Sequence, residues 1–148
     1  MNGWLLDTSI LSAFAPGKPP PSAEIIGWFE ERTDSLFLSV VTAAEIGAGV
    51  ARLRRSGADR RAQSLTVWFD RIVTAYGERV LTFDLRAAQI AGELSDEALA
   101  RGHAPGFADV AIAATAKAHR LTVLTANVRH FEPLGADVFD PFGSAPKP

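Results

Sequence analysis

A chain of 148 residues, of which 47% are hydrophobic and 22% charged, has the composition of one globular domain. No apolar run approaches the roughly 20 residues that span a bilayer, and no secretory signal is visible, so we expect a cytoplasmic protein with no membrane segment. The lack of cysteine excludes disulfides and thiolate metal sites, and the net charge of -2 means that any nucleic-acid binding depends on a local basic patch.

Short apolar runs alternate with longer Ala-rich stretches along the chain, and these patterns predict strands and helices respectively. We expect strands over residues 3–6, 36–39, 80–83 and 121–125, with a short fifth at 137–139. We expect a short helix over residues 10–15 and a second helix that Ser22 caps. Longer helices are expected over residues 42–55, 59–76, 84–101 (capped by Asp84) and 108–119. The order favours an α/β fold in which helices cover both faces of a mostly parallel sheet. Without an internal repeat or linker, we expect one domain over residues 1–142 and a flexible tail over 143–148.

Four polar residues follow the ends of predicted strands or begin the predicted helices. Asp7 follows the first strand, Glu45 lies in the first turn of the next long helix, Asp109 begins the Ala-rich helix, and Asn127 follows the fourth strand. In a parallel sheet these positions lie at one edge, where ligands bind in α/β folds. We therefore expect these four side chains to meet.

Carboxylates that meet repel one another unless a cation lies between them. Oxygen ligands without Cys or a nearby His favour Mg²⁺ or Mn²⁺ over zinc. Such a metal activates water and stabilises charge on a phosphate, so the cluster favours hydrolysis of a nucleic-acid backbone.

Each residue also has a purely structural interpretation. Glu45 completes a capping box that begins at Thr42, and Asp109 suits the positive end of a helix. Asp7 suits a turn or an N-cap, and Asn127 suits a left-handed turn. The site hypothesis therefore depends on the joint placement of the four.

Four segments, in order, resemble the motifs of PIN-domain ribonucleases: 5–9 with Asp7, 39–49 with Glu45, 109–116 with Asp109, and 124–131 with Asn127. The likeness is strongest to the VapC-like and FitB-like toxins of bacterial type II toxin–antitoxin pairs. The resemblance implies a three-layer α/β/α fold, a homodimer, a cognate antitoxin, and an endoribonuclease that hydrolyses RNA phosphodiester bonds with Mg²⁺ or Mn²⁺.

The resemblance also assigns roles. Asp7, Glu45 and Asp109 would bind metal, and Asn127 stands where many members carry a fourth Asp. Supporting hydroxyls would come from Thr8, Ser9 and Thr125.

Arg129 and His130 lie beside the predicted site and are candidate RNA contacts, whereas His103 and His119 are expected at the surface. Two other functions remain open: a catalytically silent binding module, and a phosphatase that uses Asp7 as its nucleophile.

Overall fold

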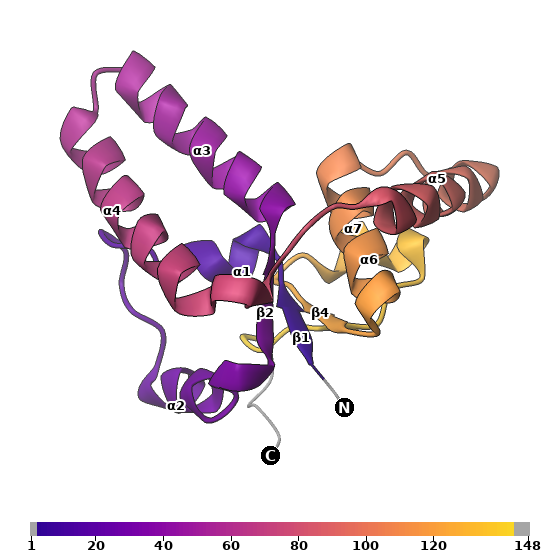
Figure 1. Cartoon of the computed structure of the whole chain (residues 1–148), viewed down its shortest axis with the longest axis horizontal. Coiled ribbons are helices and arrows are strands. Elements are labelled where there is room, and N and C mark those ends of the chain that lie inside the picture. Colours follow the sequence, from indigo (N-terminus) through magenta and orange to yellow (C-terminus); the bar gives the residue numbers. More distant parts are fainter. Residues whose placement is uncertain (1–2, 144–148) are drawn as a thin grey trace.

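A five-stranded parallel sheet lies between two layers of helices in the computed structural model, which describes residues 3–143 (Figure 1). This arrangement confirms the predicted α/β/α class. The strands are β1 (Trp4–Leu6), β2 (Leu36–Ser39), β3 (Val80–Leu81), β4 (Thr122–Leu124) and β5 (Val138–Phe139). The helices are α1 (Thr8–Ser12), α2 (Ala23–Glu31), α3 (Val40–Arg55), α4 (Asp59–Tyr76), α5 (Leu85–Ala100), α6 (Phe107–His119) and α7 (Val128–Phe131). Single 3-10 turns occupy Thr33–Ser35, Gly77–Arg79 and Glu132–Leu134.

The strands are ordered β3-β2-β1-β4-β5 across the sheet. The chain builds outward from β1 in one direction through β2 and β3, and then returns to add β4 and β5 on the other side. Leu5 pairs with Phe37 on one side and with Val123 on the other. The order therefore reverses between β1 and β4, and a crevice opens beyond the carboxyl ends of strands at such a point.

Alternate residues of the strands point into two separate cores. Leu5 and Val123 pack among residues of α5 and α6, whereas Leu6 and Leu124 pack with α1 and α2. Since successive strand residues face opposite sides, the apolar runs of β1 and β4 fill both cores at once. Gly3 leads into β1 at a close approach, because an added Cβ would lie 2.6 Å from a Leu121 side-chain carbon.

Helix α3 begins earlier than the sequence suggests, and the predicted capping box at residues 42–45 is wrong. Ser39 is the N-cap, and its hydroxyl accepts a hydrogen bond from the Val41 N–H. Thr42 is completely buried inside the helix, and Glu45 lies in the second turn rather than the first. Glu45 therefore has no capping role that would account for it.

Two other predicted caps are confirmed. The Ser22 hydroxyl accepts from the Ile25 N–H at the start of α2, and Asp84 Oδ1 accepts from the Ala87 N–H at 2.9 Å. A cap of this kind contributes about 1 kcal/mol. The carboxylate of Asp84 is thus used locally, as expected.

Smaller differences concern the ends of elements. Helix α1 covers Thr8–Ser12 instead of 10–15, and β3 and β4 are shorter than predicted. Helix α7, which follows Asn127, was not predicted, because four residues are too few to show a helical period. The fifth strand is confirmed by its pairing of Val138 with Val123. Of the predicted tail, residues 144–148 lie outside the described part of the chain.

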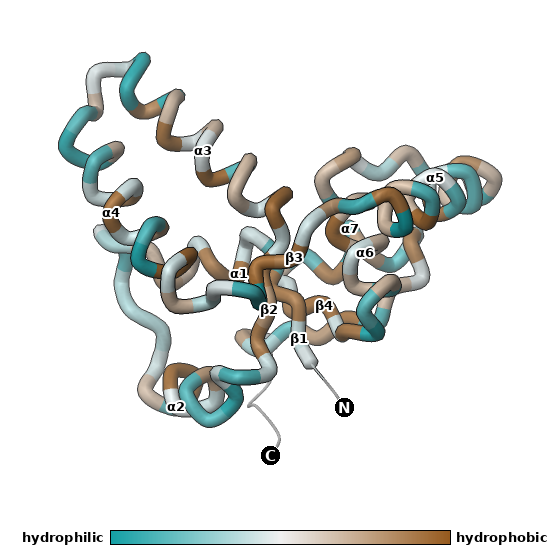
Figure 2. Tube along the Cα trace, in the orientation of Figure 1, coloured by the Kyte–Doolittle hydropathy of each residue, from teal (hydrophilic) through white to brown (hydrophobic). Residues whose placement is uncertain are grey.

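Helices α3 and α4 form a hairpin that projects from the sheet (Figure 1), and its tip is hydrophilic (Figure 2). The tip contains Gly57, whose φ of 86° suits glycine. None of the described helices is both long and apolar enough to cross a membrane.

Candidate functional site

Asp7 lies at the carboxyl end of β1 and anchors one side of the site. Its side chain is buried at 5% exposure and makes no capping bond to α1, although Asp7 occupies the N-cap position. Instead Oδ2 accepts from the hydroxyls of Ser9 at 2.8 Å and Thr125 at 2.9 Å. Asp7 is therefore the N-cap of α1 by position, as the structural interpretation expected, but its carboxylate is used in the site rather than as a cap.

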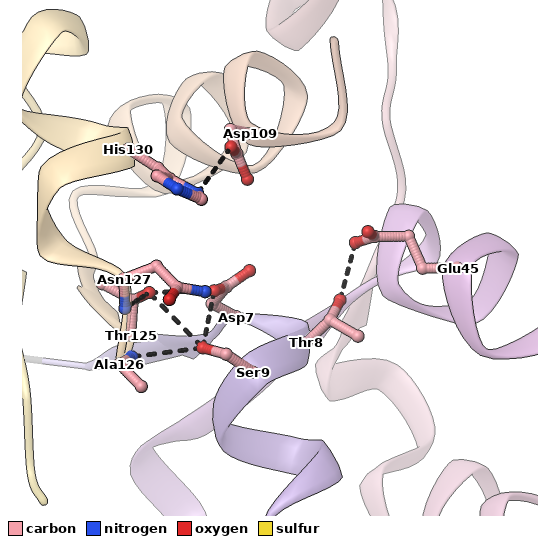
Figure 3. A network of polar contacts seen from close by, with 9 residues as sticks. All are labelled: Asp7, Thr8, Ser9, Glu45, Asp109, Thr125, Ala126, Asn127 and His130. Carbon is pink, nitrogen blue, oxygen red and sulfur yellow. Dashed lines mark hydrogen bonds and ion pairs between the residues drawn. The ribbon is translucent and has the colours of Figure 1, made fainter. Parts of the chain in front are cut away.

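The two hydroxyls around Asp7 are oriented by backbone N–H groups. The Ala126 N–H donates to Ser9 Oγ at 3.1 Å, and the Asn127 N–H donates to Thr125 Oγ1 at 2.9 Å (Figure 3). Because a hydroxyl has one proton, each can give it to Asp7 while it accepts from the backbone. The network joins the ends of β1 and β4, 118 residues apart in sequence. It leaves Oδ1 of Asp7 without a hydrogen bond from residues 3–143.

Thr8 connects the same end of β1 to helix α3. Its hydroxyl donates to Glu45 Oε1 at 2.7 Å and lies 3.1 Å from the Thr42 hydroxyl. Glu45 itself is exposed and is oriented toward β1 by this bond (Figure 3). Glu45 therefore reaches the site from α3, whose start at Val40 is fixed by the Ser39 cap.

Asp109 lies in the first turn of α6, as predicted, with its side chain 27% exposed. Its Oδ2 is 3.5 Å from Nδ1 of the exposed His130. Burial raises the pKa of the Asp109 carboxyl above its ordinary value, the charge of Asp7 raises it further, His130 opposes the shift, and Glu45 adds to it. These effects place all three carboxylates within electrostatic reach of one another.

Asn127 is the N-cap of α7, with a φ of -113° rather than the left-handed value that the structural interpretation requires. Its side chain makes no capping bond and points toward Asp7 in Figure 3. The four predicted residues therefore gather at one edge of the sheet, beside the reversal of strand order between β1 and β4.

The carboxylates of Asp7, Glu45 and Asp109 face a common space from three elements (Figure 3). Among residues 3–143, no three acidic or His side chains lie close enough together to hold a metal ion as they stand. Glu45 accepts from Thr8 instead, and Asp109 contacts His130. The donors are nevertheless all carboxylate oxygens, and burial, followed by the charges of the other two acids, raises the pKa of Asp109. A hard divalent cation such as Mg²⁺ fits this chemistry, because it takes oxygen ligands and neutralises like charges.

Two residues of this region were not assigned to it from the sequence. Thr42 was expected only to cap α3, but its hydroxyl contacts that of Thr8. His103 was expected only to lie at the surface; the structure shows in addition that it lines a cavity with Asp109, Arg129 and His130. The position of Thr42 within the second motif was the only available signal. No sequence signal was available for His103, because this residue lies in the turn between α5 and α6 and no periodic pattern predicts where a turn residue lies.

Comparison with known proteins places this geometry in a family. The PIN domain model matches residues 4–134. The VapC ribonuclease Y4jK of Sinorhizobium fredii is 32% identical over 146 residues, which cover 95% of this chain and 99% of that protein. Toxin FitB of Neisseria gonorrhoeae is 33% identical over 144 residues, which cover 93% and 97%. The crystal structure of FitAcB from Neisseria gonorrhoeae has a TM-score of 0.81 at 31% identity and covers 95% of this chain and 99% of that one.

The family model covers residues 4–134, and the two relatives cover 95% and 93% of the chain. The acids that gather at this edge of the sheet are the ones carried by the first three of the four sequence motifs. The chain belongs to the PIN-domain family, and its relatives include VapC and FitB proteins.

Proposed function

We propose that this protein is the toxin of a type II toxin–antitoxin pair and acts as an endoribonuclease that depends on Mg²⁺ or Mn²⁺. One observation carries the proposal: three carboxylates from β1, α3 and α6 face a common space where the strand order reverses. The names of the VapC ribonuclease and the FitB toxin support the activity and the biological role.

Asp7, Glu45 and Asp109 would hold the metal, and Asn127 would add a neutral oxygen. When bound, a divalent cation supplies Lewis acidity and water activation for hydrolysis of the phosphodiester. Hydrolysis breaks one P–O bond, and water gives its hydroxyl to phosphorus and a proton to the leaving oxygen. Ser9 and Thr125 hold the Asp7 side chain in position, and Thr8 directs Glu45 toward the same space.

The same bonds weigh against Asp7 as a phosphatase nucleophile. Its Oδ2 accepts from two hydroxyls, so only Oδ1 is left to act, and two further carboxylates facing the same space would repel a phosphate in the absence of a cation. The catalytically silent module stays as the alternative that the activity assay addresses.

An antitoxin partner is supported by an apolar cavity of about 200 Å³ between α1, α3 and α4. Its walls include Val50, Leu53, Leu65 and Trp68, and it shares Glu45 with the proposed site. A protein segment that fills this cavity would cover the acid and prevent RNA from reaching it.

A homodimer is supported by large apolar side chains at the surface. Leu85 is 74% exposed and Phe107 is 69% exposed, and the Phe107 ring lies 5.9 Å from the ring of Phe83. In the proposed dimer these apolar side chains would be covered by a second copy of the chain, because apolar surface that gathers in a patch marks protein contacts. Light scattering on the purified protein tests this, and a monomeric mass at high protein concentration would contradict it.

The activity is tested by incubating total bacterial RNA with the purified protein and sequencing the new 5′ ends. Discrete ends are expected with Mg²⁺ or Mn²⁺ and not with EDTA or with Asp109→Ala. Asp70→Asn, which changes an exposed acid on α4, is the matched control and should cleave normally. Cleavage by Asp109→Ala at the wild-type rate would reject the site.

The role as a toxin is tested separately in cells. Expression of the protein alone is expected to arrest growth, and co-expression of the neighbouring small reading frame is expected to relieve the arrest. Growth arrest that is equally strong for Asp109→Ala would show that RNA cleavage is not its cause.

A further inference from the structure

A polar cavity of about 310 Å³ borders Asp109 on the side that faces α7. We call this cavity the flanking pocket. Its lining includes His103, Gly106, Asp109, Arg129, His130 and Pro133. Its volume falls at the lower end of the range of ligand pockets. Asp109 belongs both to this pocket and to the acidic space, so the two are continuous.

The walls of the flanking pocket are held together by a bond between separate elements. The Arg101 guanidinium, at the end of α5, donates to the Pro133 carbonyl at 2.6 Å and to the Glu97 carbonyl at 3.3 Å. The His103 N–H donates to the Ala98 carbonyl at 2.9 Å. These bonds fix the loop that carries His103 opposite α7.

Four groups in this pocket can attract anions. Arg129 is exposed and forms no ion pair with any residue in the described part of the chain. His103 and His130 add imidazole N–H donors, although Nδ1 of His130 lies 3.5 Å from Asp109. The fourth group is the amino end of α6, a helix of 13 residues, which begins here with Gly106 as its N-cap.

Gly106 has no side chain to accept hydrogen bonds from the first N–H groups of α6, and no side-chain cap bond is present. The amino end of a helix carries partial positive charge and binds phosphate through such N–H groups. An arginine, two histidines and an uncapped helix end therefore surround one cavity.

We propose that the flanking pocket binds a phosphate of the RNA strand next to the phosphodiester that is cleaved. The proposal rests on the proposed function and adds the subsite that holds the strand. The acidic space repels a polyanion, so an RNA strand needs a source of attraction beside it. The flanking pocket supplies this within the reach of Asp109.

The test measures RNA binding separately from cleavage. A short single-stranded RNA with a fluorescent label is titrated with the Asp7→Asn protein in Mg²⁺ over a range of salt concentrations, and anisotropy gives Kd. Adding Arg129→Ala should weaken binding and reduce the slope of log K against log salt by about 0.7, the value for one phosphate contact on a single strand. Arg71→Ala, on the distant helix α4, removes the same charge and should leave the slope unchanged.

Two further variants test the other walls. His103→Ala should raise Kd, whereas His119→Ala, at the far end of α6, should not. Gly106→Ser adds a capping hydroxyl where an added Cβ meets no atom within 4 Å. It should raise Kd while the melting temperature is kept or increased, because the hydroxyl competes with phosphate for the helix N–H groups.

Equal slopes for Arg129→Ala and its parent would overturn the proposal, and so would the absence of measurable RNA binding by the parent. Displacement of the RNA by a polyglutamate peptide at a lower concentration than by unlabelled RNA would assign the pocket to an acidic protein instead. Wild-type cleavage is measured in parallel. If Arg129→Ala reduces the salt slope but the wild type shows no metal-dependent cleavage, the nuclease activity is rejected and the phosphate pocket is retained. If the wild type cleaves RNA but the slope is unchanged, only the phosphate pocket is rejected.

Discussion

Asp7 and Asp109 carry the same functional group at the same edge of the sheet, but their surroundings differ. Asp7 is buried, and two hydroxyls donate to it, each in turn oriented by a backbone N–H. Asp109 is partly exposed and has one 3.5 Å contact, to an exposed histidine. The first carboxylate is fixed by the fold, whereas the second is destabilised by burial and by the charges of the other acids.

This difference shows where rigidity and adaptability lie in the site. A network whose members are all satisfied holds one geometry, because each displaced group would lose a bond in a buried setting. Glu45 and Asp109 are less enclosed, and each has a single contact with a side chain of the described residues. On the proposed function, Asp7 would set the position of the metal and the other two acids would adjust to it.

Replacing Asp7 by Ala is expected to have the largest effect. Cleavage should fall by more than the roughly 10–100-fold loss that removal of an outer-shell partner causes. The free energy of unfolding should fall by about 1–3 kcal/mol, because the Ser9 and Thr125 hydroxyls lose their acceptor. Cleavage assays and urea unfolding check these outcomes, and an unchanged stability would show that the network does not hold Asp7 as described.

Thr125→Val tests the network without touching a carboxylate. Thr125 is completely buried, and valine keeps its shape but removes the bonds to Asp7 and to the Asn127 N–H. We expect a roughly 10–100-fold loss of cleavage and a stability loss of about 1–3 kcal/mol. The rate is compared with that of Thr74→Val on α4, whose hydroxyl donates to the Asp70 carbonyl and to no other group among residues 3–143. Equal rates for the two variants would contradict the role of Thr125.

Asn127→Asp adds a fourth carboxylate beside the acids. We expect tighter binding of Mn²⁺ in calorimetry, because the new ligand is charged, together with lower stability in EDTA, because the repulsion increases. Weaker binding than in the wild type would show that Asn127 does not face the metal.

Asp109→Asn should give the smallest change in the free energy of unfolding, and in the opposite direction to Asp7→Ala. Because the folded protein raises the pKa of Asp109 above its ordinary value of 3.8, ionisation of this carboxyl destabilises the fold at pH 7. The penalty is complete above the folded-state pKa and absent below the ordinary value. Asn removes it, so metal-free stability should rise at pH 7, and the gain should shrink as the pH falls and vanish below pH 3.8.

Urea unfolding at a series of pH values measures that gain, with Asp70→Asn as the exposed control. A gain that does not depend on pH, or a loss at pH 7, would mean that burial and the charges of the other acids do not together raise the pKa of Asp109. The contrast between the two aspartates would then disappear.

Much of the fold followed from local patterns in the sequence. The alternation of short apolar runs with Ala-rich stretches predicted the strands, the long helices and the two covered faces. The caps at Ser22 and Asp84 were also predicted, because a cap bonds within its own first turn. The joint placement of Asp7, Glu45 and Asp109 at one edge followed from the rule for parallel strands.

The sequence by itself therefore determined the class of fold and which residues would meet, since both depend on short-range periodicity and on the direction of the strands. Only the tertiary structure decided how each residue is used. The start of α3 moved from Thr42 to Ser39, because Thr42 is buried against the Thr8 hydroxyl rather than free to cap. His103 reached the site because Arg101 ties its loop to Pro133, a contact between residues 32 positions apart that no local pattern encodes.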